Sequence, residues 1–176
     1  MKGFVRFVPI ALFLAIVSVL VWRLAHPGDA LIRSKLTGRP VPAFALAAAA
    51  PGKPGLATTD LATGKPHLVN LFASWCVPCI AEMALLKQLA AEGVPIVGID
   101  IRDRPDALAR FLDNNGDPFV AIGADSDSVA QMALGSSGVP ETFVVDGRGI
   151  IRRQYIGGLT ASDLPRVRAA LAEAAR

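Results

Sequence analysis

The chain has two cysteines, Cys76 and Cys79, separated by two residues. They lie between an apolar run at 67–73, which is typical of a buried strand, and a stretch at 77–92 whose apolar residues recur at helical spacing. Cys76 is therefore expected at the N-terminus of a helix, where unpaired backbone amides and the helix dipole stabilise a thiolate. Cys79 follows in the first turn, on the same side and within disulfide reach. The pair predicts dithiol redox chemistry, with Cys76 as the attacking thiolate and the more buried Cys79 as the resolving thiol.

Other uses of a CxxC pair fit this chain less well. A structural zinc site normally has four nitrogen or sulfur ligands, and the two histidines, His26 and His67, are far apart in the sequence. Covalent haem attachment needs CxxCH, but residue 80 is Ile. A structural disulfide that closes so small a loop adds little stability. We predict neither a metal nor a cofactor. Transport of Cu(I) on the soft thiolates is the alternative from another functional class, although no additional His or Met is evident near the motif.

The elements that position this pair follow from the pattern of the remaining chain. Strand-like runs occur at 67–73, 94–100, 119–122, 142–145 and 150–155, and helical patterns at 77–92, 105–112, 126–134 and from residue 160 or 163 onward. Residues 146–149 (DGRG) are predicted to join the last two strands as a hairpin. This order predicts an α/β fold in which a central mixed sheet is flanked by helices on both faces. Residues 47–55, rich in Ala, Pro and Gly, are predicted as a loop.

An uncharged apolar segment at 7–22 precedes this domain, bounded by Arg6 and Arg23. With its apolar neighbours it reaches the about 20 residues that a bilayer span needs, provided that both arginines extend to the interface. No small-x-small cleavage site follows it closely, so we interpret residues 1–25 as a retained transmembrane anchor rather than a cleaved signal peptide or a core helix. Residues 26–39 are interpreted as a tether and 40–176 as the folded domain. Basic residues flank both sides of the span, so the charge pattern leaves its orientation open.

The distribution of charge excludes a nucleic-acid surface. Residues 1–39 hold six of the 18 basic residues and one of the 15 acidic residues, which leaves 40–176 with a net charge of −2.

A calcium loop at 113–117 is excluded as well, because Pro and Ala occupy the positions at which Gly and Glu are required. The aspartates at 100, 103, 125 and 127 are interpreted as turn and cap residues.

Several segments together resemble the thioredoxin superfamily. Residues 70–79 (NLFASWCVPC) are similar to its redox strand and loop, and residues 138–143 (GVPETF) to the segment that carries its cis-proline. With the N-terminal span, the segment at 38–44 and CIAE at 79–82, the resemblance narrows to the membrane-anchored CcmG/DsbE-type thiol:disulfide interchange proteins of cytochrome c biogenesis.

This resemblance implies a thioredoxin-like fold and a thiol:disulfide oxidoreductase, held by a single span in the bacterial inner membrane with its domain in the periplasm. It implies that the dithiol reduces a disulfide in apocytochrome c, or in a haem-ligation chaperone, so that haem can be attached. A transmembrane thiol reductant of the DsbD/CcdA kind would restore the dithiol. A general periplasmic disulfide reductase, with the same chemistry and more clients, is the second alternative.

The resemblance also assigns roles to residues beside the cysteines. A cis Val139–Pro140 bond would place backbone next to the sulfurs, where an extended substrate segment could pair with it. Trp75 would either contact the substrate or pack beside the site.

Two glutamates are candidates for proton transfer. Glu82 lies one turn beyond Cys79 and Glu141 directly follows the expected cis-proline, so both are expected near the sulfurs. Many thioredoxins have a buried Asp where this chain has Asn70, which cannot hold a proton at neutral pH. That task is therefore either absent or performed by Glu82 or Glu141. The alternative is that both glutamates are surface groups.

Overall fold

The computed structural model describes residues 8–25 and 36–176. The chain forms two compact units, Met1–Ile32 and Arg33–Arg176. The described part of the first unit is helix α1 (Val8–Ala25). Across the described residues, no helix combines the length and the apolarity that a bilayer crossing demands. The anchor at 1–25 therefore stays a prediction, and most of the tether at 26–39 lies outside the described residues.

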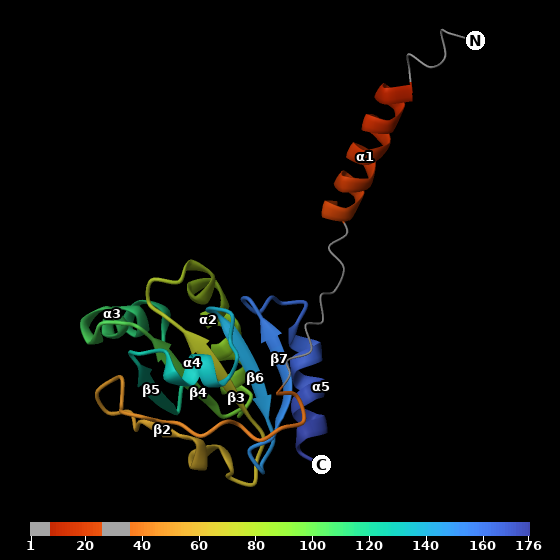
Figure 1. Cartoon of the computed structure of the whole chain (residues 1–176). Helices are drawn as coiled ribbons and strands as arrows, with labels where there is room; N and C mark the ends of the chain where they lie inside the picture. Colours follow the sequence, from red (N-terminus) through yellow and green to blue (C-terminus); the bar gives the residue numbers. More distant parts are fainter. Residues whose placement is uncertain (1–7, 26–35) are drawn as a thin grey trace. The chain divides into compact units, whose positions relative to one another are not determined.

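The centre of the second unit is a five-stranded sheet with the strand order β5-β4-β3-β6-β7 (Figure 1). Strands β3 (His67–Phe72), β4 (Ile96–Ile101) and β5 (Ala121–Asp125) run parallel, whereas β6 (Glu141–Val145) and β7 (Ile151–Ile156) are antiparallel to their neighbours. All residues of β3 and β4 are buried, as expected for central strands that are covered on both faces. The predicted mixed sheet is confirmed.

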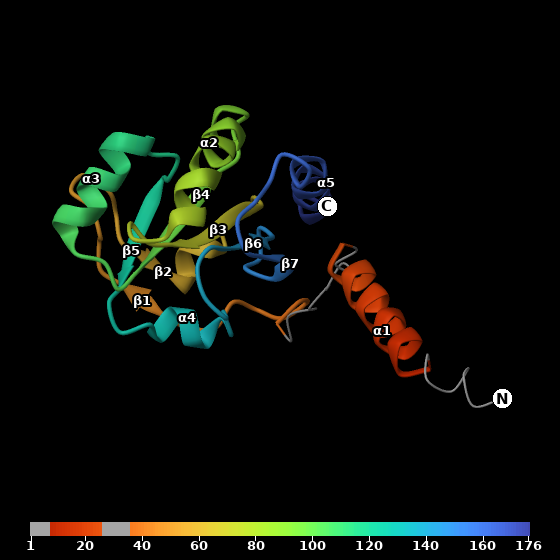
Figure 2. The same ribbon diagram turned by 90° about the horizontal axis from the view of Figure 1, so that it is seen from above.

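The longer helices of this unit cover one face of its sheet (Figure 2). These are α2 (Val77–Ala91), α3 (Pro105–Asn115) and α5 (Leu164–Ala174). Their buried apolar side chains form one core cluster with Leu68 and Phe72 of β3, and both cysteines belong to it. The redox pair is thus part of the core on this face.

The opposite face is covered by shorter elements. They are helix α4 (Val129–Ala133), the 3-10 turn η2 (Thr58–Leu61), and a hairpin of two antiparallel strands, β1 (Ala45–Leu46) and β2 (Leu56–Ala57). Residues 47–55 form the predicted loop, but the hairpin that this loop closes was not predicted. Strands of two residues are too short to show an alternating pattern.

This hairpin packs on β5 at Gly123. A Cβ atom added to Gly123 would lie 2.7 Å from Cβ of Leu46 and 3.0 Å from Cβ of Leu56, closer than side chains pack. Gly123→Ala is therefore expected to destabilise the domain by about 1–3 kcal/mol, the usual cost of overpacking, measured as a lower midpoint of urea unfolding. Gly138→Ala is the matched control because nothing lies within 4 Å of its added Cβ. An equal midpoint shift in both variants would contradict close packing at Gly123.

The strand predicted at 119–122 begins two residues later in the structure. Phe119 precedes β5 and turns its ring onto Phe72, with ring centroids 4.6 Å apart. Its apolar character therefore reflects core packing outside the strand, which the local pattern could not separate from strand pairing.

The helix predicted at 126–134 is shorter at both ends. Its start is delayed because Ser128 has a left-handed backbone conformation, with φ of 57°. Asp125 accepts hydrogen bonds from the amides of residues 130 and 131, which confirms its predicted role as a cap. The same prediction is wrong for Asp100, which lies inside β4 with only 5% of its surface exposed.

Candidate active site

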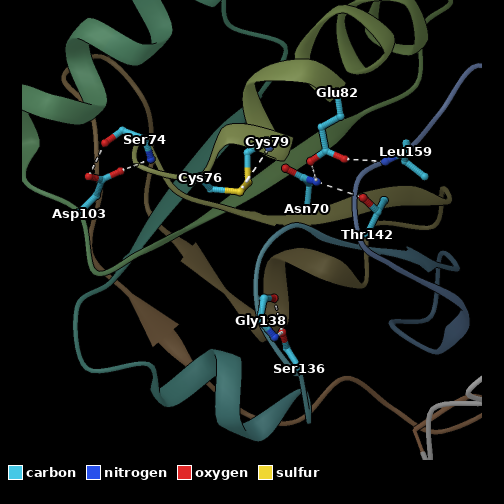
Figure 3. The surroundings of a disulfide bond; sticks show 10 residues. All are labelled: Asn70, Ser74, Cys76, Cys79, Glu82, Asp103, Ser136, Gly138, Thr142 and Leu159. Carbon is cyan, nitrogen blue, oxygen red and sulfur yellow. Dashed lines mark hydrogen bonds between the residues drawn. A yellow bond between two sulfur atoms is a disulfide. The ribbon is translucent and has the colours of Figure 1, made fainter.

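Cys76 and Cys79 form a disulfide with their Cα atoms 5.2 Å apart (Figure 3). Cys76 is the N-cap residue of α2, and the backbone N–H of Cys79 donates a hydrogen bond to its Sγ atom over 3.2 Å. The contact shows that an amide of the first turn points at this sulfur. The predicted position of the pair at a helix N-terminus is confirmed, and the same amide would stabilise a thiolate there.

The two sulfur-bearing residues differ in burial in the predicted order. Cys79 is fully buried and Cys76 is 4% exposed. The side chains on either side of Cys76 are open to solvent, with Trp75 60% and Val77 74% exposed. A partner thiol therefore reaches the pair from the Cys76 side. Trp75 lies on the surface next to Cys76 and is not packed into the core.

The loop between β3 and α2 is held from the neighbouring strand. Ser74 donates from its backbone N–H to Oδ2 of Asp103 over 2.5 Å and from its hydroxyl to Oδ1 over 2.6 Å. Asp103 lies just beyond the end of β4, which runs parallel to β3. The predicted role of Asp103 as a turn or cap residue did not include this contact, because nothing local in the sequence links residues 29 positions apart.

The peptide bond between Val139 and Pro140 is cis, as the resemblance implied. This loop precedes β6 and is tied to the end of β7 by a hydrogen bond from Gly157 N to Pro140 O, 3.0 Å long. A Cβ on Gly158 would lie 3.4 Å from the carbonyl oxygen of Pro78 and 3.7 Å from Cγ of Pro140. Pro78 of the CxxC motif and Pro140 therefore flank the same backbone segment, which brings the two loops together.

Glu82 is buried, with 1% of its surface exposed, one turn beyond Cys79 on α2. Its Oε1 atom accepts from Nδ2 of Asn70 and its Oε2 atom from the backbone N–H of Leu159, each over 3.0 Å (Figure 3). Burial raises the pKa of Glu82 above its ordinary value, and these two hydrogen bonds oppose the shift. The alternative that Glu82 is a surface group is wrong. A carboxyl group whose pKa is raised by burial beside a dithiol is a candidate for proton transfer.

Glu141 is also buried, but on the other face of the sheet. It pairs with Leu71 in the ladder between β3 and β6, and paired residues project to the same face, which here carries the second core cluster. Its Oε1 atom accepts from the N–H and hydroxyl of Ser137, over 2.8 and 2.7 Å, and its Oε2 atom from Gln154 over 2.7 Å. Glu141 is neither a surface group nor directed at the disulfide; it holds the loop that leads to Pro140.

The comparisons with known proteins agree with this geometry. The family model Redoxin matches residues 36–171. The chain is 38% identical over 165 residues to the thiol:disulfide interchange protein DsbE of Escherichia coli (strain K12), covering 90% of this chain and 88% of that protein. It is 39% identical over 157 residues to the protein of the same name from Pseudomonas fluorescens biotype C, covering 89% and 86%.

A solved structure is similar over most of the chain. The crystal structure of a thiol:disulfide interchange protein of the thioredoxin family from Chlorobium tepidum TLS matches with a TM-score of 0.59 and 26% identity, over 82% of this chain and 99% of that one. The chain belongs to the redoxin family, as a thiol:disulfide oxidoreductase of the DsbE type.

Proposed function

We propose that this chain reduces protein disulfides during cytochrome c maturation. The observation that carries the proposal is the redox pair at the N-terminus of α2 next to the cis-proline loop, in a chain of the DsbE type. The client is apocytochrome c or a haem-ligation chaperone, whose cysteines must be reduced before haem is attached. A transmembrane thiol reductant of the DsbD/CcdA kind regenerates the dithiol. A net charge of −2 over 40–176 gives no support for a nucleic-acid partner.

The reaction begins with the reduced protein. The Cys76 thiolate attacks one sulfur of the client disulfide, a mixed disulfide forms, and the other client sulfur leaves as a thiolate. Cys79 then loses its proton and attacks Sγ of Cys76, which closes the internal disulfide and releases the second client thiolate. The client gains two electrons and the Cys76–Cys79 pair loses them. In the other half of the cycle, the transmembrane thiol reductant gives two electrons to the Cys76–Cys79 disulfide by the same exchange in reverse. This step restores the dithiol.

The surroundings of Cys76 suit an extended client segment. Trp75, Val77 and Ile80 are exposed apolar residues at the start of α2, with Ile80 43% exposed. Val139, directly before the cis bond, is half-buried, and Pro140 after it lies with Pro78 of α2 against Gly158. We propose that client backbone pairs with Val139 and Pro140 while its side chains contact the three apolar residues.

Glu82 is proposed as the group that accepts the proton of Cys79. Glu82→Gln keeps the shape and one of the two acceptor oxygens but cannot take up a proton. The decay of the mixed disulfide is therefore expected to slow by on the order of tenfold to a hundredfold near neutral pH, at or below the low end of what positioned general bases contribute. Formation of the mixed disulfide stays unchanged. Rapid-quench sampling with a disulfide peptide separates the two steps.

The control for this variant is Glu173→Gln, at an exposed glutamate of α5. It should leave both steps as they are. If Glu82→Gln slows the first and second steps equally, Glu82 supports the fold of the site and does not transfer the proton.

Membrane attachment through residues 1–25 is part of the proposal. Its support is the uncharged run at 7–22, followed by the tether at 26–39. The full chain should remain in the membrane fraction after carbonate washing, and a C-terminal alkaline phosphatase fusion should be active, since that enzyme folds only in the periplasm. Release by carbonate, or an inactive fusion, would contradict a single span with a periplasmic domain.

The cellular role is tested by deletion and complementation. Cells that lack the chain are expected to lose most covalent c-type haem, detected by haem staining of gels. The parent gene should restore it and Cys76→Ser should not, while a small thiol in the medium should restore it without the protein. Normal haem staining in the deletion strain would refute the maturation role and leave the general periplasmic reductase. Stoichiometric Cu(I) binding by the reduced protein would favour the metal-carrier alternative.

A further inference from the structure

Ser74 is the point at which the loop of Cys76 is attached to the rest of the domain. One carboxylate, that of Asp103, accepts both of its hydrogen bonds, over 2.5 and 2.6 Å. Within the loop itself, Cys76 N donates to Ala73 O over 3.2 Å. The bonds to Asp103 connect this turn to the end of β4 (Figure 3). The path of the chain from the end of β3 to Cys76 therefore depends on the position of the Asp103 carboxylate.

A second carboxyl group, that of Asp100, faces Asp103. Asp100 pairs with Phe72 in the ladder of β3 and β4, and the alternation along β4 directs it to the face that α2 covers. It is 5% exposed, and its Oδ1 atom has no hydrogen-bond partner within residues 8–25 and 36–176. Two ionised carboxylates in contact at a buried position repel each other strongly. The arrangement is stable when one of them carries a proton.

The surroundings place that proton on Asp100. Burial, followed by the charge and the hydrogen bond of Asp103, raises the pKa of Asp100 to about 8. The nearby cations do not offset this: Arg104 pairs with Asp106, and Arg102 is exposed. The carboxylate oxygens of Asp103, in contrast, already accept three hydrogen bonds, from Ser74 N, Ser74 Oγ and Arg104 N.

We propose that Asp100 and Asp103 share one proton, and that this pair positions Ser74 and thereby holds the Cys76 sulfur at the N-terminus of α2. Protonated Asp100 donates a hydrogen bond to the Asp103 carboxylate, which fixes that carboxylate on Ser74. The loop then keeps Sγ of Cys76 in line with the amide of Cys79, which donates to this sulfur over 3.2 Å in the disulfide form and would stabilise the thiolate after reduction. Ser74, Asp100 and Asp103 are positioning residues. The inference rests on the proposed function because it concerns the thiolate that performs the exchange.

The first test measures the pKa of Cys76 in the reduced full chain, solubilised in detergent, from the pH dependence of its alkylation by iodoacetamide. Ser74→Ala removes one of the two hydrogen bonds without changing any charge. It is expected to raise the pKa of the Cys76 thiol and to slow alkylation several-fold below that pKa. Ser74→Thr restores the parent rate. Ser126→Ala, at an exposed serine in the turn before α4, is the control and leaves it unchanged.

Asp103→Ala separates positioning from electrostatics. If Asp103 acted only through its charge, its removal would lower the pKa of Cys76 and speed alkylation. The positioning role predicts slower alkylation, as in Ser74→Ala. Faster alkylation in Asp103→Ala, or a parent-like rate in Ser74→Ala, overturns the inference.

The second test detects the shared proton directly. The backbone amide signal of Ser74 in ¹H–¹⁵N spectra is expected to shift with an inflection near pH 8, the pKa of Asp100, and to lose that inflection in Asp100→Asn. A Ser74 signal that does not titrate in the parent overturns the shared proton. Exchange with a disulfide peptide is measured in parallel: its absence in the parent refutes the proposed function, whereas normal exchange with unaltered Cys76 reactivity in Ser74→Ala refutes only this inference.

Discussion

Cys79→Ser is expected to convert most of the protein into a mixed disulfide with its client. Cys76 can still attack the client disulfide, but the step that resolves the intermediate needs the second sulfur, which the variant lacks. The fully buried position of Cys79 assigns it this second step, because a client cannot reach a side chain with no exposed surface. Non-reducing gels of native membranes, followed by mass spectrometry of the reductant-sensitive bands, detect the adduct and identify the client.

The control is Cys76→Ser, which removes the attacking sulfur and should form no adduct. Absence of any adduct through Cys76 in the Cys79→Ser protein would contradict the exchange mechanism. The identity of the trapped proteins separates the two reductase hypotheses. Apocytochrome c or a haem-ligation chaperone supports the maturation role, whereas many unrelated periplasmic proteins would support a general reductase.

Sequence reasoning located the redox pair because its signal is local. An apolar strand, the CxxC motif and an amphipathic helix follow one another within 67–92, so their junction could be predicted without knowing the fold. The cis bond at Pro140 was reached through the resemblance in GVPETF and not from the residue itself, since only about 5–6% of X–Pro bonds are cis.

The environment of the glutamates could not be predicted in this way. The partners of Glu82 are Asn70 and Leu159, the second of them 77 residues away in sequence, so its burial depends on how α2 packs. Glu141 faces away from the disulfide because its register against β3 pairs it with Leu71. A register shifted by one residue would have directed it to the other face. The packing of α2 decides the environment of Glu82 and the strand register decides that of Glu141, and the sequence pattern contains neither.

The role of Asp100 was missed for a related reason. An aspartate at the end of an apolar run is usually a turn or cap residue, and at Asp125 that interpretation is confirmed. Asp100 instead continues β4 by pairing with Phe72 and Ala124 and is buried next to a second carboxyl group. A buried acid of this kind lowers the free energy of unfolding at neutral pH, and the size of this effect depends on pH.

Asp100→Asn is expected to stabilise the oxidised protein at pH 8, with a gain that disappears toward pH 4. The pKa of Asp100 rises from 3.8 to about 8 on folding, through burial and the charge of Asp103. Between these values the native state holds a proton that the unfolded chain has released. The unfolded state binds fewer protons there, so the free energy of unfolding falls as pH rises, by about 1.4 kcal/mol per pH unit for one proton. The stabilisation that comes from the proton on native Asp100 is therefore fully present below pH 4 and lost above pH 8.

Asparagine has the same shape, does not titrate, and can still donate a hydrogen bond to Asp103. The free energy of unfolding of the variant therefore does not fall with this proton. Its excess over the parent value should grow from near zero at pH 4 to a few kcal/mol at pH 8, allowing for local relaxation. Urea unfolding of both proteins in the same detergent, with the disulfide intact, measures the difference at each pH and cancels other titrations. Asp113→Asn, at an exposed position of α3, should give a difference that does not change with pH. If the difference in the free energy of unfolding between Asp100→Asn and the parent also did not change with pH, Asp100 would be ionised in the native state. That result would contradict the shared proton.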